Sequence, residues 1–136
     1  MKNTILLLLL MTLLACDKND TVNPTNNDIE PVTDFLRVGN GLLIVLLTDD
    51  EVDETNYFDS YVFNFGSDGS VVAADSNNTV NGTYSVFSDD GRIELRMNFP
   101  NTQKFGELND DWYFISINQN TIRFDDDGDI LEFQQK

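Results

Sequence analysis

Carboxylates are the side chains in this sequence that could carry chemistry. Acidic residues outnumber basic ones by 24 to 8, and they gather in two runs, residues 49–54 (DDEVDE) and 125–129 (DDDGD). Paired carboxylates can hydrolyse glycosides, and clustered ones can bind Ca²⁺. The chain has no histidine, which excludes Ser/His/Asp and Cys/His nucleophilic centres and His-ligated metals. Because carboxylate pairs arise by chance in so acidic a chain, we expect no catalytic residues and no enzyme.

Neither acidic run matches a known calcium loop. In residues 125–129 carboxylates stand at alternating positions, but an EF-hand loop needs Gly at its sixth position and Glu at its twelfth, where Ile130 and Lys136 stand. We interpret this run as a hairpin tip, and residues 49–54 as a solvated connection between the first two strands. The sequence therefore predicts no metal site and no cofactor, with weak divalent binding or partner steering by residues 49–54 as the alternative.

The single cysteine, Cys16, follows an N-terminal segment that is typical of a secretory leader. Lys2 supplies a positive charge, residues 5–14 are apolar, and Ala15 is small. Ten residues of helix span roughly 15 Å, about half of a bilayer's hydrocarbon core, so the segment is too short to cross a membrane. One interpretation is an ordinary signal peptide that is followed by a cysteine without a function.

Residues 13–16 (LLAC) resemble the bacterial lipobox, in which the cysteine receives a diacylglyceryl group and becomes the first residue after cleavage. The resemblance implies a signal peptide over residues 1–15 and lipid attachment at Cys16. Asp17 and Asp20 resemble the acidic stretch that directs some lipoproteins to the outer face of the outer membrane. We therefore expect a cell-envelope protein, lipid-anchored to the outer membrane.

Residues 16–34 are predicted to form a flexible tether, because their scattered aliphatic residues have neither helical nor strand period. Within it, residues 20–22 (DTV) resemble an O-glycosylation site of exported bacterial proteins, with Thr21 as the acceptor. A chance match of three residues is the alternative.

Net charge restricts the partners. The formal charge is −16, and it becomes −17 once Lys2 leaves with the leader. This sign repels nucleic acid and anionic head groups, so the lipid must hold the chain to the membrane. We expect a monomer whose partner is a basic envelope protein or a small apolar ligand. Ca²⁺ and Mg²⁺ should stabilise it equally, by screening.

From Gly41 onward, short apolar alternations broken by turns predict an antiparallel sheet. Residues 92–99 (RIELRMNF) place Ile93, Leu95, Met97 and Phe99 on a core face, with Arg92, Glu94, Arg96 and Asn98 facing water. Gly69, Gly91 and Gly128 stand where hairpins require positive φ. About eight strands, at 42–48, 60–66, 70–75, 79–88, 92–99, 111–118, 121–125 and 130–135, predict an all-β up-and-down barrel. A two-sheet β-sandwich is the alternative.

The stretches 61–75 (YVFNFGSDGSVVAAD), 81–86 (NGTYSV), 107–117 (ELNDDWYFISI) and 129–136 (DILEFQQK) resemble the lipocalin-like domains of small lipoproteins from Gram-negative bacteria. The resemblance covers nearly all of residues 35–136. It implies a calycin-type barrel over that range and no established activity.

Two classes of function fit these expectations. In the first, the barrel is a non-catalytic binding module that holds a small apolar ligand inside or a protein on its rim. In the second, the chain is a structural or surface-coat lipoprotein with no dedicated ligand. Ten phenylalanines, together with Trp112, which we expect in the core, suggest a filled interior. The composition therefore favours binding at the rim.

Overall fold

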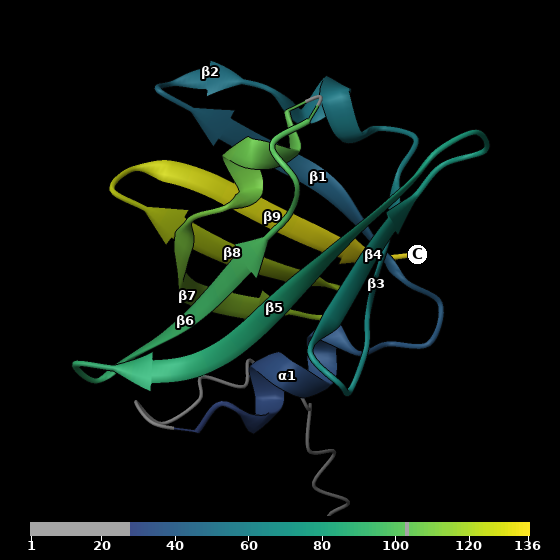
Figure 1. Ribbon diagram of the computed structural model, residues 1–136. Helices are drawn as coiled ribbons and strands as arrows, with labels where there is room; N and C mark the ends of the chain where they lie inside the picture. Colours follow the sequence, from purple (N-terminus) through teal and green to yellow (C-terminus); the bar gives the residue numbers. More distant parts are fainter. Residues whose placement is uncertain (1–27, 103) are drawn as a thin grey trace, which may run out of the picture.

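The computed structural model describes residues 28–102 and 104–136, and its strands form one antiparallel sheet (Figure 1). The helical elements are α1 (Glu30–Leu36) and the 3₁₀ helices η1 (Thr55–Phe58) and η2 (Phe105–Leu108). The strands are β1 (Leu42–Asp49), β2 (Val52–Asp53), β3 (Val62–Phe65), β4 (Ser70–Ala74), β5 (Thr79–Asp89), β6 (Arg92–Asn98), β7 (Asp111–Asn118), β8 (Thr121–Asp126) and β9 (Asp129–Gln135). The predicted strands are confirmed, apart from shifts of one or two residues at their ends.

Eight of these strands close into a barrel. From β3 to β9 each strand pairs with the next, β1 pairs with β3 through Leu42 and Phe63, and β1 also pairs with β9 from Leu42 to Leu47. The ninth strand, β2, extends β1 as a short hairpin outside the ring. The predicted barrel is therefore confirmed, and the β-sandwich alternative is wrong.

Strand alternation directs side chains as expected, with one exception on β6. The apolar residues of that strand and of its end are buried: Ile93, Leu95, Met97 and Phe99. Glu94, predicted to face water, is only 5% exposed. It lies between Phe87 and Tyr113 on the neighbouring strands, and the guanidinium groups of Arg96 and Arg92 stack on those two rings. These four side chains cover the carboxylate from outside the barrel.

Aromatic rings fill the barrel interior. Phe58, Phe63, Phe105 and Phe133 are at most 1% exposed, and neighbouring ring centroids lie 5.3 Å (Phe58 and Phe105) and 5.5 Å (Phe63 and Phe133) apart. Trp112, 2% exposed, also lies in the core as predicted. Edge-to-face packing of this kind stabilises a core beyond the area that it buries.

The N-terminal boundary of the domain differs from the prediction. Residues 30–34 were expected to belong to the tether, but they form most of α1, in which Val32 and Leu36 are fully buried and Phe35 is 7% exposed. Pro31 at the start of the helix suits a first turn, and Val32, Phe35 and Leu36 follow the i, i+3, i+4 spacing of one helix face. The segment is too short for a visible period, so its helix depends on packing against the barrel.

Turns join consecutive strands at the two ends of the barrel. Gly69, Gly91 and Gly128 have positive φ, as predicted. The predicted connection between the first two strands, β1 and β3, contains the unpredicted strand β2, which Asp50 and Glu51, with φ of 49° and 66°, join to β1 in a two-residue turn. In Figure 1, α1 lies at the bottom, while β2, η1 and η2 lie at the top. Within the described residues, none of the helices has the length and apolar character needed to span a bilayer.

Candidate functional site

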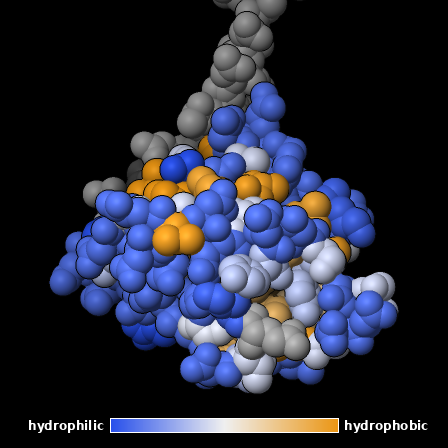
Figure 2. Space-filling model, turned by 90° about the horizontal axis from the view of Figure 1, so that it is seen from above, coloured by the Kyte–Doolittle hydropathy of each residue, from blue (hydrophilic) through white to orange (hydrophobic). Residues whose placement is uncertain are grey.

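Acidic residues gather at the end of the barrel opposite α1. The end of β1, the β2 hairpin, η2, the start of β7 and the β8–β9 turn meet there, and they form a surface that we call the acidic rim: Asp49, Asp50, Glu51, Asp53, Glu54, Glu107, Asp110, Asp126, Asp127 and Asp129. Viewed from above, this end is covered mostly by hydrophilic residues (Figure 2). Among the described basic residues, Lys104 belongs to the rim, and Arg96 lies beside it, paired with Asp111 at the start of β7.

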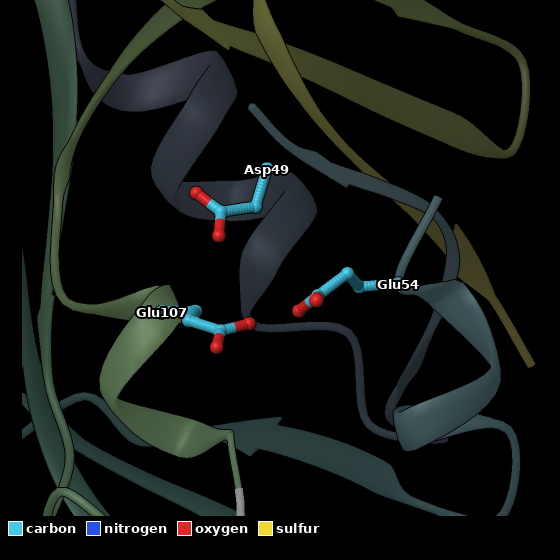
Figure 3. A group of neighbouring side chains, drawn as sticks. All are labelled: Asp49, Glu54 and Glu107. Carbon is cyan, nitrogen blue, oxygen red and sulfur yellow. The ribbon is translucent and has the colours of Figure 1, made fainter. Parts of the chain in front are cut away.

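Three members of the rim converge. Asp49, Glu54 and Glu107 each offer a carboxylate oxygen, and these oxygens all lie within 4.8 Å of one another. Figure 3 shows the three side chains pointing into a common space, from the end of β1, from the residue before η1 and from η2. We call these residues the carboxylate cluster. Glu54 is 8% exposed, and the other two are more open.

Local hydrogen bonds fix Glu54. Its backbone N–H donates to the carbonyl of Leu47 at 2.8 Å, and the backbone N–H of Leu47 donates to Thr55 Oγ1 at 2.9 Å. The Asp53 carboxylate accepts from the backbone N–H of Thr55 at 3.0 Å, as in an Asx turn. Phe58 then anchors η1 in the core. The sequence between β1 and β3 therefore folds back onto β1 and directs Glu54 inward.

Glu107 is carried by a connection that is equally well anchored. Phe105 and Leu108 are buried at the i and i+3 positions of η2. The Asn109 side chain bridges to Phe99, accepting from its backbone N–H at 2.6 Å and donating to its carbonyl at 2.8 Å. Trp112 Nε1 donates to the carbonyl of Leu108 at 3.1 Å. These contacts hold Glu107 over the end of β1.

Lys104 joins the two glutamates. Its Nζ donates to Glu54 Oε1 at 3.0 Å and to Glu107 Oε1 at 2.8 Å, and it lies 5.0 Å from the centre of the Tyr57 ring. Its backbone has φ of 71°, a left-handed conformation that is uncommon for a residue other than glycine. Together the two ion pairs raise the pKa of Lys104, so the ammonium stays charged.

The second oxygens of the glutamates face a different environment. Glu54 Oε2 and Glu107 Oε2 are both buried, and neither has a hydrogen-bond partner among the described residues. The neighbouring Glu107 carboxyl and the Lys104 ammonium lower the pKa of Glu54, whereas burial and the neighbouring Glu54 carboxyl raise the pKa of Glu107. Burial and the nearby carboxylates of Asp50 and Asp129 raise the pKa of Asp49. The cluster therefore holds more negative charge than Lys104 neutralises.

The second acidic run forms a hairpin tip, as predicted. Residues 125–129 form the β8–β9 hairpin tip, with Gly128 at φ of 108°. Burial and the facing Asp110 carboxyl raise the pKa of Asp126 to about 6. This pair adds to the rim beside the carboxylate cluster.

The sequence located part of this site. Residues 49–54 were interpreted as a solvated connection, but Glu54 is buried, since η1 folds back onto β1. Glu107 was missed, because no strand alternation marks residues 100–110. The i, i+3 pair Phe105 and Leu108 was the available signal for η2. Cys16 and Thr21, the predicted lipid and glycan acceptors, lie outside the described residues.

A further hollow lies at the other end of the molecule. A groove of about 470 Å³ runs between α1 and β5, lined among others by Thr33, Arg37, Tyr84 and Val86. The Tyr84 hydroxyl accepts from Arg37 Nε and donates to the carbonyl of Gly66, both at 2.8 Å. These bonds attach the end of α1 to the barrel.

Comparisons with known proteins do not identify a family. No protein-family model and no curated protein matches the sequence. A crystal structure of a DUF4847 family protein from Bacteroides vulgatus ATCC 8482 aligns with a TM-score of 0.45 and 20% identity, over 60% of this chain and 62% of that chain. The chain thus covers less than two thirds of that structure's length.

Proposed function

We propose that this chain is a lipid-anchored envelope protein whose lipocalin-like barrel is a non-catalytic binding module, and that it binds a basic protein partner through the acidic rim. The observation that carries the proposal is the gathering of both acidic runs on one surface. Ten carboxyl groups form the rim, and Lys104 is the basic residue that lies among them. A surface of one sign attracts partners of the opposite sign and raises their association rate.

The position of the rim supports the same proposal. The described chain begins at residue 28, beside α1, and the rim lies at the opposite end of the barrel (Figure 1). If Cys16 carries the lipid, the anchor joins the domain at the α1 end. The rim would then be the end that is free to meet a partner.

The filled interior favours binding at the rim over binding of a ligand inside the barrel. Side chains that point inward from every barrel strand are almost fully buried, including Leu42, Phe63, Val71 and Phe133 at 0% exposure. A barrel that carries an apolar ligand keeps an open cavity. Here aromatic rings occupy the centre, so the outer surfaces are better candidates for binding.

Lipid attachment is tested at Cys16. In cells fed a labelled fatty acid, the wild-type chain should carry the label and fractionate with membranes, and Cys16→Ser should appear as a soluble or unprocessed form. Absence of the label from the wild type would refute the anchor. Protease digestion of intact cells would then show which face of the membrane the domain occupies.

Partner binding is tested with charge variants that leave the carboxylate cluster intact. The triple variant Asp50→Asn, Glu51→Gln, Asp127→Asn removes three exposed rim charges. Its matched control, Asp34→Asn, Asp89→Asn, Asp90→Asn, removes three exposed charges near the α1 end. With a basic lysozyme-type envelope hydrolase as the probe, we expect the rim variant alone to slow association, and added salt to abolish the difference.

Equal association rates for the two triple variants would show that the rim does not steer the probe. Failure of basic envelope proteins to bind the wild type at low salt would favour a structural or coat role instead.

A further inference from the structure

We infer that the carboxylate cluster is a binding site for a divalent cation of the size of Ca²⁺, with Asp49, Glu54 and Glu107 as its ligands. This inference is independent of the proposed partner, because it concerns the inside of the rim rather than its exposed charges. It also departs from the sequence-based expectation of no metal site.

The spacing of the oxygens suits a calcium ion. Ca²⁺ binds oxygens at 2.3–2.6 Å, so two ligands of one ion lie up to about 5 Å apart. The cluster's oxygens, all within 4.8 Å of one another, meet this limit. Mg²⁺ requires about 2.0–2.1 Å and nearly ideal octahedral geometry. Three carboxylates from separate connections meet this demand less well, so the arrangement favours the larger ion.

A buried polar atom without a donor also points to a missing ligand. Glu54 is more than nine-tenths buried, and its Oε2 has no hydrogen-bond donor among the described residues. The Oε2 atom of Glu107 shares this condition. A buried carboxylate oxygen without a partner is strongly unfavourable. Since Lys104 Nζ binds only the Oε1 atoms in the described geometry, the Oε2 side of both groups is left for a cation.

The charge of the site matches a divalent ion. Three carboxylates and the Lys104 ammonium sum to a charge of −2, which one divalent cation neutralises. Asp50 and Asp129 lie near Asp49 and increase the attraction for cations.

The elements that carry the ligands are held in place before any ion binds. Phe58 in η1 and Phe105 in η2 meet edge to face, with ring centroids 5.3 Å apart, so the elements that carry Glu54 and Glu107 are joined through the core. Asp49 is held by the ladder between β1 and β2. A site assembled on anchored elements loses less entropy when it binds its ion.

Terbium, a luminescent ion of the size of Ca²⁺, gives a direct readout with the purified full chain. Tyr57 lies beside Lys104 and is close enough to the site to sensitise its emission. We expect saturable 1:1 emission that Ca²⁺ displaces with a dissociation constant of about 10⁻⁴–10⁻³ M, as in extracellular calcium modules. Mg²⁺ at the same concentration should displace less of it.

Two cluster variants and one matched control locate the ion. Glu107→Gln and Asp49→Asn each remove a ligand with little change in shape, and they should weaken Ca²⁺ competition at least tenfold. Asp127→Asn removes a rim charge outside the cluster and should change it less than twofold. Asp49 is partly exposed, so Asp49→Asn keeps the test valid if Glu107→Gln fails to fold.

Two results would overturn the inference. Emission that does not saturate, or that falls equally in Asp127→Asn and the cluster variants, would mean that cations only collect over the rim. Absence of Ca²⁺ competition up to millimolar concentrations would mean that a proton, rather than a metal ion, lies between the two glutamates. Neither result bears on the charge variants that test partner binding.

Discussion

Asp126 is the residue whose titration should be easiest to detect in the stability of the fold. Burial and Asp110 raise its pKa from 3.8 to about 6. Between about pH 4 and pH 6 the folded chain therefore binds a proton that the unfolded chain has released. The proton therefore stabilises the fold fully below pH 3.8, the pKa of Asp126 in the unfolded chain. This contribution is lost as the pH rises through about 6, its pKa in the folded chain.

The variant Asp126→Asn should remove that dependence. We expect it to be more stable than the wild type at pH 7, with the difference shrinking toward pH 4. Urea denaturation at a series of pH values measures this. Asp90→Asn, which removes an exposed carboxylate near the α1 end, is the control. A difference between Asp126→Asn and wild type that is constant from pH 4 to pH 7 would contradict the assignment.

Single residues also show where sequence reasoning stops. Glu54 lies in a run of six residues whose composition indicates solvent, yet it is buried, because contacts of Thr55 and Phe58 that no local pattern reveals turn it inward. Glu107 joins Glu54 from far along the chain. Proximity of this kind follows from closure of the barrel, and a single sequence gives no measure of it.

Among the elements, the strands were predictable and the short helices were not. A half-buried strand alternates between core and solvent, as β6 does apart from Glu94, and its period is visible in six or seven residues. The helices α1, η1 and η2 span only seven, four and four residues. A helical period needs a longer segment to become visible, and packing rather than propensity determines such short helices.

The helix α1 should contribute measurably to stability. The sequence assigned residues 30–34 to the tether, but a chain beginning at Asp34 would lack Val32, which is fully buried. Loss of that side chain and of the first turn should lower the free energy of unfolding by roughly 2 kcal/mol or more, relative to a chain beginning at Asp28. Chemical denaturation of the two chains measures the difference. Equal stabilities would mean that α1 packs without stabilising the barrel.

A substitution in the turn between β1 and β2 should stabilise the protein. Asp50 and Glu51 both have positive φ, which a type I′ hairpin requires and which glycine adopts without strain at the second position. Glu51→Gly should therefore stabilise the protein by about 1 kcal/mol. The matched control is Glu51→Gln, which removes the same charge and keeps the strain. Equal effects of the two variants would assign the gain to charge instead.

At the scale of the whole molecule, self-repulsion is the dominant electrostatic effect. With a formal charge of −16 and the acidic runs gathered at one end, compaction brings like charges together. Raising NaCl from about 10 mM to about 200 mM shortens the screening length from roughly 30 Å to less than 10 Å. The midpoint of thermal unfolding should rise by a few degrees. A midpoint that falls with salt would mean that ion pairs such as that of Arg96 with Asp111 outweigh the repulsion.

The seam between β1 and β9 has a consequence for how the chain reaches its folded state. These strands lie near the two ends of the described chain, whereas every pair from β3 to β9 joins sequence neighbours. Closing so long a loop is entropically unfavourable and slow. A chain that emerges N-terminus first, from a ribosome or through a membrane channel, cannot complete its barrel until β9 has followed. Its architecture thus delays closure of the barrel until the last strand is available to pair with β1.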